Sequence, residues 1–251
     1  MIATDHVEPD ERGPDKQLEL MEHLTELRSR LGRCILYVGL GAIVGWIFYQ
    51  FFFNLLSGPV APYLKAHKST FLLTGVAEGF TIKMQISLMV GLILAMPFIT
   101  MEGWRFIAPG LTRQERKGIH LVGPLSVILF AGGVAAAYWV LPAGVKWLTD
   151  QNPKDAVFMP SVQGTLLFVL KMCLAFGIVF QLPVVLMFLA KVGLVDSRML
   201  RSYWRQAVVA LAIVAAVATP SNDAFSMMMM CLPLITLYGL SIGLVKLVER
   251  R

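Results

Sequence analysis

The segment M-E-H-L-T-E-L-R-S-R, from Met21 to Arg30, is the last polar stretch before the first long apolar run of the chain. It contains the acids Glu22 and Glu26 and the bases Arg28 and Arg30. Glu26 and Arg30 are four residues apart, which on a helix favours a surface ion pair worth about 0.3–0.5 kcal/mol. A polar helix at the mouth of an apolar bundle is either solvated in this way or binds a charged ligand.

The composition of the rest of the chain is that of a membrane protein. Of its 251 residues, 57% are hydrophobic and 15% are charged, whereas a soluble domain has about 45–50% apolar and about 25% charged residues. The net charge of +6 comes from bases at the ends of apolar segments, where membrane topology requires them, so it does not indicate nucleic-acid binding. The composition therefore predicts a polytopic membrane protein.

Six apolar segments are each predicted to form a transmembrane helix, because lipid offers no partner for unpaired backbone groups. They span about residues 34–56, 84–101, 119–141, 165–190, 206–218 and 225–248. The expected organisation is a mobile cytoplasmic tail over residues 1–17 and one six-helix transmembrane domain over 18–248. Residues 18–33 are expected to form a helix lying near the membrane surface. The predicted fold class is all-α.

The last two segments are predicted to be short. Only 13 residues separate Arg205 from Thr219, enough helix for about 20 Å of a hydrocarbon core of about 30 Å. The sixth segment contains Pro233, which favours a kink or a short helix. Short helices thin the bilayer, pull their charged flanks inward or associate with other helices.

The lysines and arginines predict the orientation of the chain. If both termini and the second and fourth connections share one side, that side has sixteen Lys and Arg residues. The other side has four, which are Lys65, Lys68, Lys146 and Lys154. The richer side is expected to be cytoplasmic. The outer connections 57–79 and 142–164 are long enough to cap the outer face. The third, T-P-S-N-D at 219–223, predicts a tight turn in which Pro220 stops one helix and Ser221, Asn222 or Asp223 caps the next.

Familiar catalytic and metal-binding patterns are missing from the sequence. It has no glycine-rich phosphate loop and no H-E-x-x-H pair, and its three cysteines lie in separate apolar runs. We therefore expect no cofactor, metal or disulfide. The segment G-L-S-I-G at Gly239–Gly243 formally matches a hydrolase elbow around Ser241, but it lies in an apolar helix. Its glycines, like Gly41 and Gly45, favour close helix packing instead.

Gln181 is the polar residue deepest in the fourth apolar segment. An amide in hydrocarbon needs a hydrogen-bond partner, which lies either in this chain, on a partner helix or along a polar path. Pro183 is expected to kink this helix, and Lys171 can extend towards the membrane surface. A secondary transporter with a polar path near Gln181 and Lys171 is the alternative function. Met227–Met230 suits adaptable helix contacts.

The connection W-R-F-I-A-P-G-L-T-R-Q-E-R-K, residues 104–117, contains the single acid Glu115, which lies among Arg113, Arg116 and Lys117. We expect Glu115 and Glu26 to face each other across the inner mouth of the bundle. Two carboxylates at a fixed spacing suit a basic peptide, because the arginine fork binds carboxylates with two hydrogen bonds.

Four motifs in order resemble the TatC family, the core receptors of the twin-arginine protein translocase. They are H-L-T-E-L-R-S-R-L (23–31), F-I-A-P-G-L with Q-E-R (106–111 and 114–116), F-G-I-V-F-Q-L-P (176–183) and A-T-P-S-N-D-A-F-S (218–226). The resemblance covers roughly residues 20–245. It implies a concave, glove-like bundle of six helices in the bacterial cytoplasmic membrane, with short fifth and sixth helices and both termini cytoplasmic. It also implies a receptor and scaffold rather than an enzyme.

The resemblance implies roles for individual residues. Glu26 and Glu115 match the two acidic positions that recognise the arginines of the signal peptide, and Arg28 and Phe106 match other positions of that surface. Residues expected to shape functional turns are Pro59, Pro109, Pro220 and Asp223. Gln181 and Met227 are expected to contact partner helices, although many members of the family carry Glu and Gln at these two positions.

The resemblance also implies partners. They are the twin-arginine signal peptides of folded substrates and single-span subunits of the TatA-like and TatB-like kinds, which dock near the fifth and sixth helices in a multimeric complex. The family's transport is driven by the proton-motive force, and no nucleotide site is expected on this chain. Because Gln181 does not titrate in the ordinary pH range, we expect it to act through hydrogen bonds and not as a proton carrier.

Overall fold

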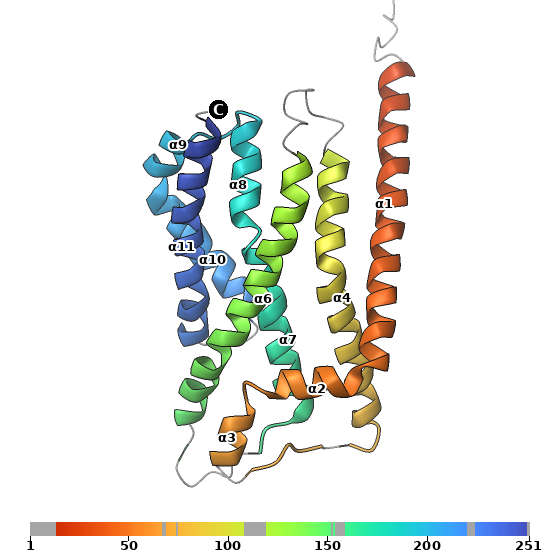
Figure 1. Ribbon diagram of the computed structural model, residues 1–251, viewed down its shortest axis with the longest axis vertical. Helices are drawn as coiled ribbons and strands as arrows, with labels where there is room; N and C mark the ends of the chain where they lie inside the picture. The colour runs from red at the N-terminus through yellow and green to blue at the C-terminus, as the bar shows by residue number, and fades with distance from the viewer. Residues whose placement is uncertain are drawn as a thin grey trace, which may run out of the picture.

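The computed structural model describes residues 14–66, 69–73, 75–107, 119–151, 153, 159–219 and 224–249. Within these residues the chain is helical, apart from connecting segments and one isolated bridge between Leu72 and Ser161. Figure 1 shows the helices side by side in one bundle. They are α1 (Pro14–Ile47), α2 (Tyr49–Ser57), α3 (Ala61–Ala66), α4 (Glu78–Ile107), α6 (Ile119–Asp150), α7 (Val162–Val179), α8 (Leu182–Lys191), α9 (Ser197–Ser202), α10 (Trp204–Ala218) and α11 (Ala224–Glu249).

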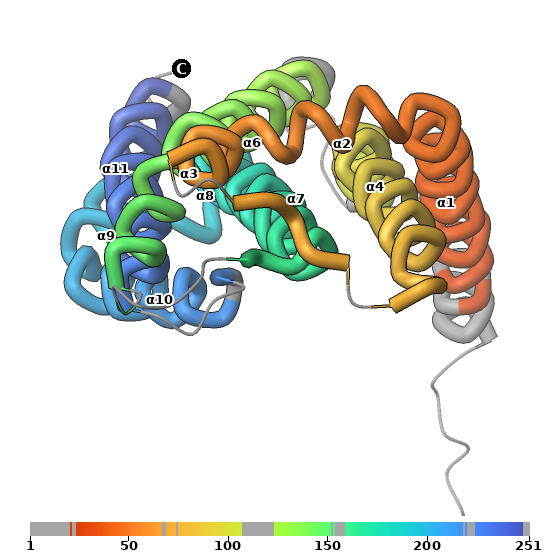
Figure 2. The backbone as a smooth tube through the Cα atoms, turned by 90° about the horizontal axis from the view of Figure 1, so that it is seen from below, coloured from red at the N-terminus to blue at the C-terminus, as the bar shows by residue number. Residues whose placement is uncertain are grey.

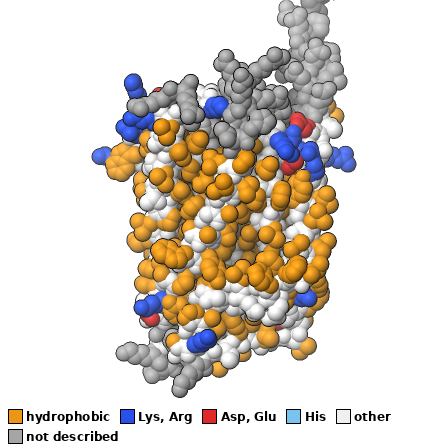
Figure 3. Space-filling model, viewed as in Figure 1, with side chains coloured by type: hydrophobic (Ala, Val, Ile, Leu, Met, Phe, Trp, Pro, Cys, Tyr) orange, Lys and Arg blue, Asp and Glu red, His pale blue; other side chains and the backbone are white. Residues whose placement is uncertain are grey.

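Five stretches of the described helices are long and apolar enough to cross a membrane. They are Leu24–Ile47, Glu78–Phe106, Gly123–Asp150, Val162–Lys191 and Ala224–Leu247, and a shorter apolar helix covers Trp204–Val217. Figure 3 shows hydrophobic side chains in a broad band between two rims that carry the charges. The predicted all-α, polytopic membrane fold is confirmed, and five long spans with one short apolar helix are compatible with six crossings.

Of the last two apolar helices, which were both predicted to be short, only the first is short. Helix α10 has 15 residues, so it is about 22 Å long and shorter than the hydrocarbon core of about 30 Å. Helix α11 has 26 residues and continues through Pro233, so the prediction of a short sixth helix is wrong. A proline costs a helix one backbone hydrogen bond, and in α11 the loss does not end the helix.

The segment before the first span is not a separate helix on the membrane surface. Helix α1 begins at Pro14 and runs straight through residues 18–33 into the apolar segment, so the surface-helix prediction is wrong (Figure 1). It also ends before the predicted limit at residue 56. The chain turns at Phe48, and α2 lies across one end of the bundle.

Helices α1 and α4 approach closely through small residues. A Cβ added to Gly41 would lie 2.7 Å from the carbonyl oxygen of Gly91, and one added to Gly45 would lie 2.8 Å from that of Ser87. The packing role predicted for Gly41 and Gly45 is therefore confirmed. At Gly239 and Gly243 no such contact occurs within this chain, because no described residue lies within 4 Å of a Cβ added at either position, so packing through these two glycines stays a prediction.

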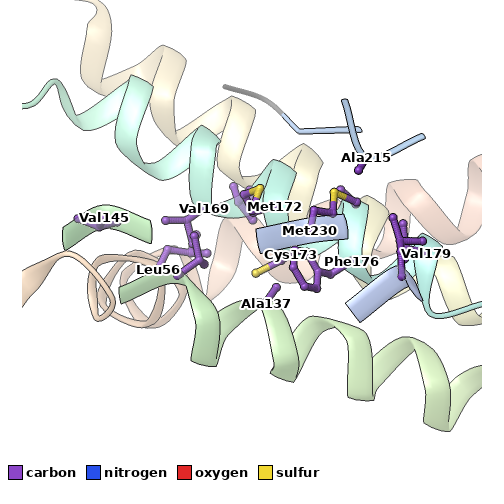
Figure 4. Close-up of a cluster of buried hydrophobic side chains, with 14 of the residues drawn as sticks. Leu56, Ala137, Val145, Val169, Met172, Cys173, Phe176, Val179, Ala215 and Met230 are labelled. Atoms are coloured by element: carbon purple, nitrogen blue, oxygen red, sulfur yellow. The ribbon is translucent and has the colours of Figure 1, made fainter. Parts of the chain in front are cut away.

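The hydrophobic core is built around α7, which lies in the middle of the bundle (Figure 2) and packs mainly on α6, and residues of α2, α4, α10 and α11 complete it. Phe176 and Met172 of α7 and Met230 of α11 are buried there beside Ala137 of α6 (Figure 4). Glycines again permit the close approach, since a Cβ on Gly177 would lie 2.8 Å from a ring carbon of Phe130.

The fourth apolar segment breaks into two helices at Gln181. Helix α7 ends at Val179 and α8 begins at Leu182. Pro183 explains the break, because it has no N–H to donate to the carbonyl of Val179 and its ring crowds that carbonyl. The kink predicted from Pro183 is confirmed, and the break leaves the amide of Gln181 between the two helices.

The predicted outer caps meet at the end of the bundle that α2 crosses. The amide of Leu72 donates to Pro160 (3.1 Å) and the amide of Val162 donates to Leu72 (3.2 Å). Pro59 is buried between α2 and α3, and the Tyr138 hydroxyl donates to the carbonyl of Leu55 nearby (3.0 Å). Helix α6 continues to Asp150, nine residues past its predicted end, so the second cap is partly helical. The role of Pro59 stays a prediction.

Candidate functional site

Glu26 and Arg30 form an ion pair on α1, as their spacing predicts. The Nε of Arg30 donates to Oε1 of Glu26 at 3.0 Å, and its Nη2 donates to the same oxygen. The side chains are 32% exposed for Glu26 and 15% exposed for Arg30. The pair is therefore less exposed than an ordinary surface pair, and the second helix that covers it explains the difference.

That second helix is α4, which contributes the buried acid Glu102. Its side chain is 3% exposed. Oε2 accepts from Nη1 of Arg30 at 2.9 Å, and Oε1 accepts from Arg33 at 3.2 Å and from Arg105 at 3.4 Å. One buried carboxylate thus binds three guanidinium groups from two helices.

Glu102 is the functional candidate that the sequence analysis did not single out. The predicted second span ended at residue 101, which left Glu102 just outside it and before the connection 104–117, but α4 continues to Ile107 and keeps Glu102 inside a helix. The available signal was an acid one turn from the end of an apolar segment. Such an acid indicates a buried ion pair only when basic residues are known to face it.

Arg30 joins the two helices into one charged cluster, composed of Glu26, Arg30, Arg33, Glu102 and Arg105. It bonds Glu26 and Glu102 together and also donates to the backbone carbonyl of Arg105 at 3.2 Å. Figure 3 shows charged side chains gathered at the rim where α1 and α4 run together. The cluster fixes the side chain of Glu26 relative to the end of α4.

The structure brings together only some of the residues predicted for peptide binding. Arg28 is exposed on α1, and Phe106 is partly exposed in the last turn of α4, close in sequence to the cluster. Glu115 and Pro109 lie outside the described residues, as do Pro220 and Asp223. The predicted meeting of Glu26 and Glu115 therefore stays a prediction.

Gln181 finds one partner within this chain. Its Nε2 donates to the backbone carbonyl of Ser126 on α6 at 2.9 Å. Its Oε1 and the hydroxyl of Ser126 are both buried and have no hydrogen-bond partner in the described part of the chain. A buried acceptor without a donor costs about 1–3 kcal/mol, so this site can gain stability from a polar group that reaches it.

A pocket of about 350 Å³ opens beside Gln181, between the end of α4 and helix α8. It is lined by Thr100, Gly103, Trp104, Gln181, Val185, Phe188 and Leu189. The rings of Trp104 and Phe188 are in contact, with centroids 4.7 Å apart. Lys171 does not line this pocket, and its side chain is exposed on α7. The pocket is therefore lined mostly by apolar groups, and the amide of Gln181 is part of its lining.

Two other residues from the sequence analysis lie on α11. Met227 is partly buried and packs against the core. Ser241 is fully buried, and its hydroxyl donates to the carbonyl of Leu237 in the same helix at 2.6 Å. Ser241 thus lies in a continuous helix and not at the sharp turn that a nucleophile elbow requires.

These features define an all-helical integral membrane protein with a charged cluster between two helices at one end and a polar helix break inside the bundle. The family model described as Sec-independent protein translocase protein (TatC) matches residues 22–233. The chain belongs to the TatC family.

Individual relatives agree with the family match. The TatC protein of Desulforapulum autotrophicum is 37% identical over 223 residues, covering 88% of this chain and 82% of that protein. The TatC protein of Carboxydothermus hydrogenoformans is 33% identical over 236 residues, covering 94% of this chain and 96% of that protein.

A solved structure has the same fold. The crystal structure described as Twin Arginine Translocase Receptor- TatC superposes with a TM-score of 0.76 and 35% identity, covering 90% of this chain and 99% of that one. The resemblance seen in the four motifs is confirmed. The chain is a component of the Sec-independent protein translocase, and its relatives are named as transport components and not as enzymes.

Proposed function

We propose that this chain is the receptor subunit that binds twin-arginine signal peptides at the charged cluster of α1 and α4. Glu26 is the carboxylate partner of one arginine and Glu115 the partner of the other. Arg28 and Phe106 form part of the same surface. The observation that carries this proposal is that the partly exposed carboxylate of Glu26 already binds a guanidinium, that of Arg30, through two nitrogens.

An incoming arginine is the natural competitor for that position. It presents the same planar fork as Arg30, so it can share the carboxylate of Glu26 or replace Arg30 there. Arg30 retains its bond to Glu102 in either case. A lysine lacks the fork and makes a single-point contact, so the arrangement favours arginine over lysine.

Binding of a fluorescent twin-arginine signal peptide to the purified protein in detergent tests this proposal. Glu26→Gln and Glu115→Gln should each lower affinity by about 10- to 150-fold, the loss of a charge-assisted pair worth about 1.5–3 kcal/mol. A twin-lysine peptide should bind weakly to every variant. Glu78→Gln, which removes one carboxylate at the opposite end of α4, is the matched control. Equal affinity for both peptides, or no loss in the Glu26 and Glu115 variants, would refute the proposal.

We further propose that Gln181 and Met227, together with the short helix α10, recruit single-span TatA-like and TatB-like subunits. The Oε1 of Gln181, which has no hydrogen-bond partner among the described residues, supports this, because a polar side chain on a partner helix can supply a donor. The receptor then works in a multimeric complex whose transport is driven by the proton-motive force.

Replacing Gln181 with leucine separates recruitment from stability. The free energy of unfolding of this variant should lie within about 1 kcal/mol of the wild-type value. The substitution removes one hydrogen bond, but it also removes a buried acceptor that has no partner among the described residues. Co-purification of the single-span subunits should fall several-fold, whereas Gln50→Leu, an exposed amide on α2, should leave it unchanged. If both variants retain the subunits equally, Gln181 is not the contact.

We propose the bacterial cytoplasmic membrane as the location, with both termini on the cytoplasmic side. The excess of lysine and arginine on that side supports this orientation. The start of α1 and the end of α11 also lie at the same end of the bundle (Figure 1). The charged cluster then faces the compartment in which signal peptides are made.

A further inference from the structure

Arg33 and Arg105 form a pair of guanidinium groups held by one oxygen atom. Both donate to Oε1 of Glu102, Arg33 from α1 at 3.2 Å and Arg105 from α4 at 3.4 Å. Because the two nitrogens share one acceptor, they lie no farther apart than the sum of these distances. The buried carboxylate thus fixes two cations from different helices side by side.

The pair retains the capacity to bind an anion. Each guanidinium has five N–H donors, and the bond to Glu102 uses one. The side chains are 44% exposed for Arg33 and 58% exposed for Arg105. The described charged residues of this region are four arginines, counting Arg28, against Glu26 and Glu102, so the surface is cationic as a whole.

The position of the pair along the helices matches the level of lipid headgroups. Arg105 lies at the end of the candidate span Glu78–Phe106, and Arg33 lies in the first half of the span Leu24–Ile47. Both therefore lie near the charged rim, with the apolar band beginning beside them (Figure 3).

An apolar seam continues from the pair into the membrane. On α1, Tyr37 and Leu40 follow Arg33 at the spacing of one helix face, and on α4 Phe98 precedes Arg105 by two turns on the same face. The rings of Tyr37 and Phe98 are in contact, with centroids 5.5 Å apart. Leu40 and Phe98 are each 54% exposed. The seam offers an acyl chain a surface directly below the two guanidinium groups.

We propose that Arg33 and Arg105 bind the phosphodiester headgroup of an anionic phospholipid, whose acyl chain lies along the seam between α1 and α4. Charge complementarity and the fork geometry of two guanidinium groups select the phosphate. The exposed apolar seam beneath them distinguishes a lipid from a free phosphate ion. Glu102 positions the two arginines and does not itself contact the lipid. The lipid thereby secures α1, which has few other neighbours.

Native mass spectrometry of the purified full chain in detergent tests this site, with phosphatidylglycerol and phosphatidylcholine added separately. Wild-type protein should bind phosphatidylglycerol about tenfold or more tightly than phosphatidylcholine. The double variant Arg33→Gln/Arg105→Gln should lose that preference. Arg198→Gln/Arg201→Gln, which removes the same charge from exposed positions on α9 at the same end of the bundle, should retain it.

Three results would overturn the proposal: no preference for phosphatidylglycerol in the wild type, an equal loss in the α9 control, or displacement of the bound lipid by millimolar inorganic phosphate. The last result would identify a site for free anions. Circular dichroism checks the fold of each variant. If the double variant does not fold, the lipid preference is measured on the single variant Arg105→Gln, since this exposed side chain should be dispensable for folding. An unchanged lipid preference in that variant also counts against the site.

Discussion

Replacing Glu102 with alanine should lower the free energy of unfolding by about 3–5 kcal/mol, the usual cost of removing one partner from a buried ion pair. Arg30 is 15% exposed and would lose its ion pair with α4 while keeping its hydrogen bond to the backbone carbonyl of Arg105 and remaining enclosed. Arg33 and Arg105 are more exposed, so water replaces most of what they lose. The main damage is therefore a partly buried guanidinium left between two helices with a single carboxylate.

Unfolding of the purified protein by a denaturing detergent, followed by circular dichroism, measures this effect. Glu26→Ala is the comparison, because it removes a carboxylate from the same arginine at a more exposed position, in an i, i+4 pair along one helix. It should cost no more than about 1 kcal/mol. If the two variants lose the same free energy of unfolding, the burial of Glu102 does not determine how much it contributes to stability. Glu26→Ala should still weaken peptide binding, which separates the structural acid from the receptor acid.

Replacing Gly91 with alanine should destabilise the protein by about 1–3 kcal/mol, the range for overpacking a close contact. A Cβ at this position would overlap the backbone nitrogen of Ala42 and lie 2.7 Å from its Cα. The atoms that must yield are backbone atoms of α1, which no change of rotamer can move. The two helices would have to separate, and the cluster at their end would separate with them.

Gly39→Ala is a control with the same chemical change on α1. No described residue lies within 4 Å of a Cβ at that position, so the substitution should stabilise the helix by up to about 1 kcal/mol. The same unfolding assay compares the two variants. A neutral Gly91→Ala would show that the α1–α4 contact relaxes easily. In that case binding of the signal peptide should also be unaffected.

Glu102 and Gly91 together explain how Glu26 is positioned. The candidate span of α1 is largely exposed and packs mainly on α4. Its depth and rotation therefore depend on the glycine contact in the middle of the bundle and on the charged cluster at the end. Loss of either should alter peptide binding without any change to the residues proposed to bind the peptide.

Several features were predictable because they depend on local chemistry. The apolar runs predicted the helical membrane fold, the distance between Arg205 and Thr219 predicted the short α10, and Pro183 predicted the break beside Gln181. The ion pair of Glu26 and Arg30 followed from its four-residue spacing. Each of these depends on a single continuous stretch of the chain, so the sequence contains all the necessary information.

Other features required the fold. Pro233 is similar in kind to Pro183, but α11 continues through it. Gly239 and Gly243 have the same spacing as Gly41 and Gly45, but among the described residues of this chain only Gly41 and Gly45 contact another helix. A proline permits a helix break and a glycine pair permits a close helix contact. Whether either occurs depends on how the neighbouring helices pack.

By itself, the sequence determined that the chain crosses the membrane as helices, because hydrocarbon leaves backbone groups no other partner. It also determined the family, through four motifs in order. Only the tertiary structure decided that Glu102 binds Arg30 and Arg33, which are 72 and 69 residues away in sequence. The physical reason is that a buried charge requires partners, but the identity of those partners depends on which helices pack side by side and at what depth.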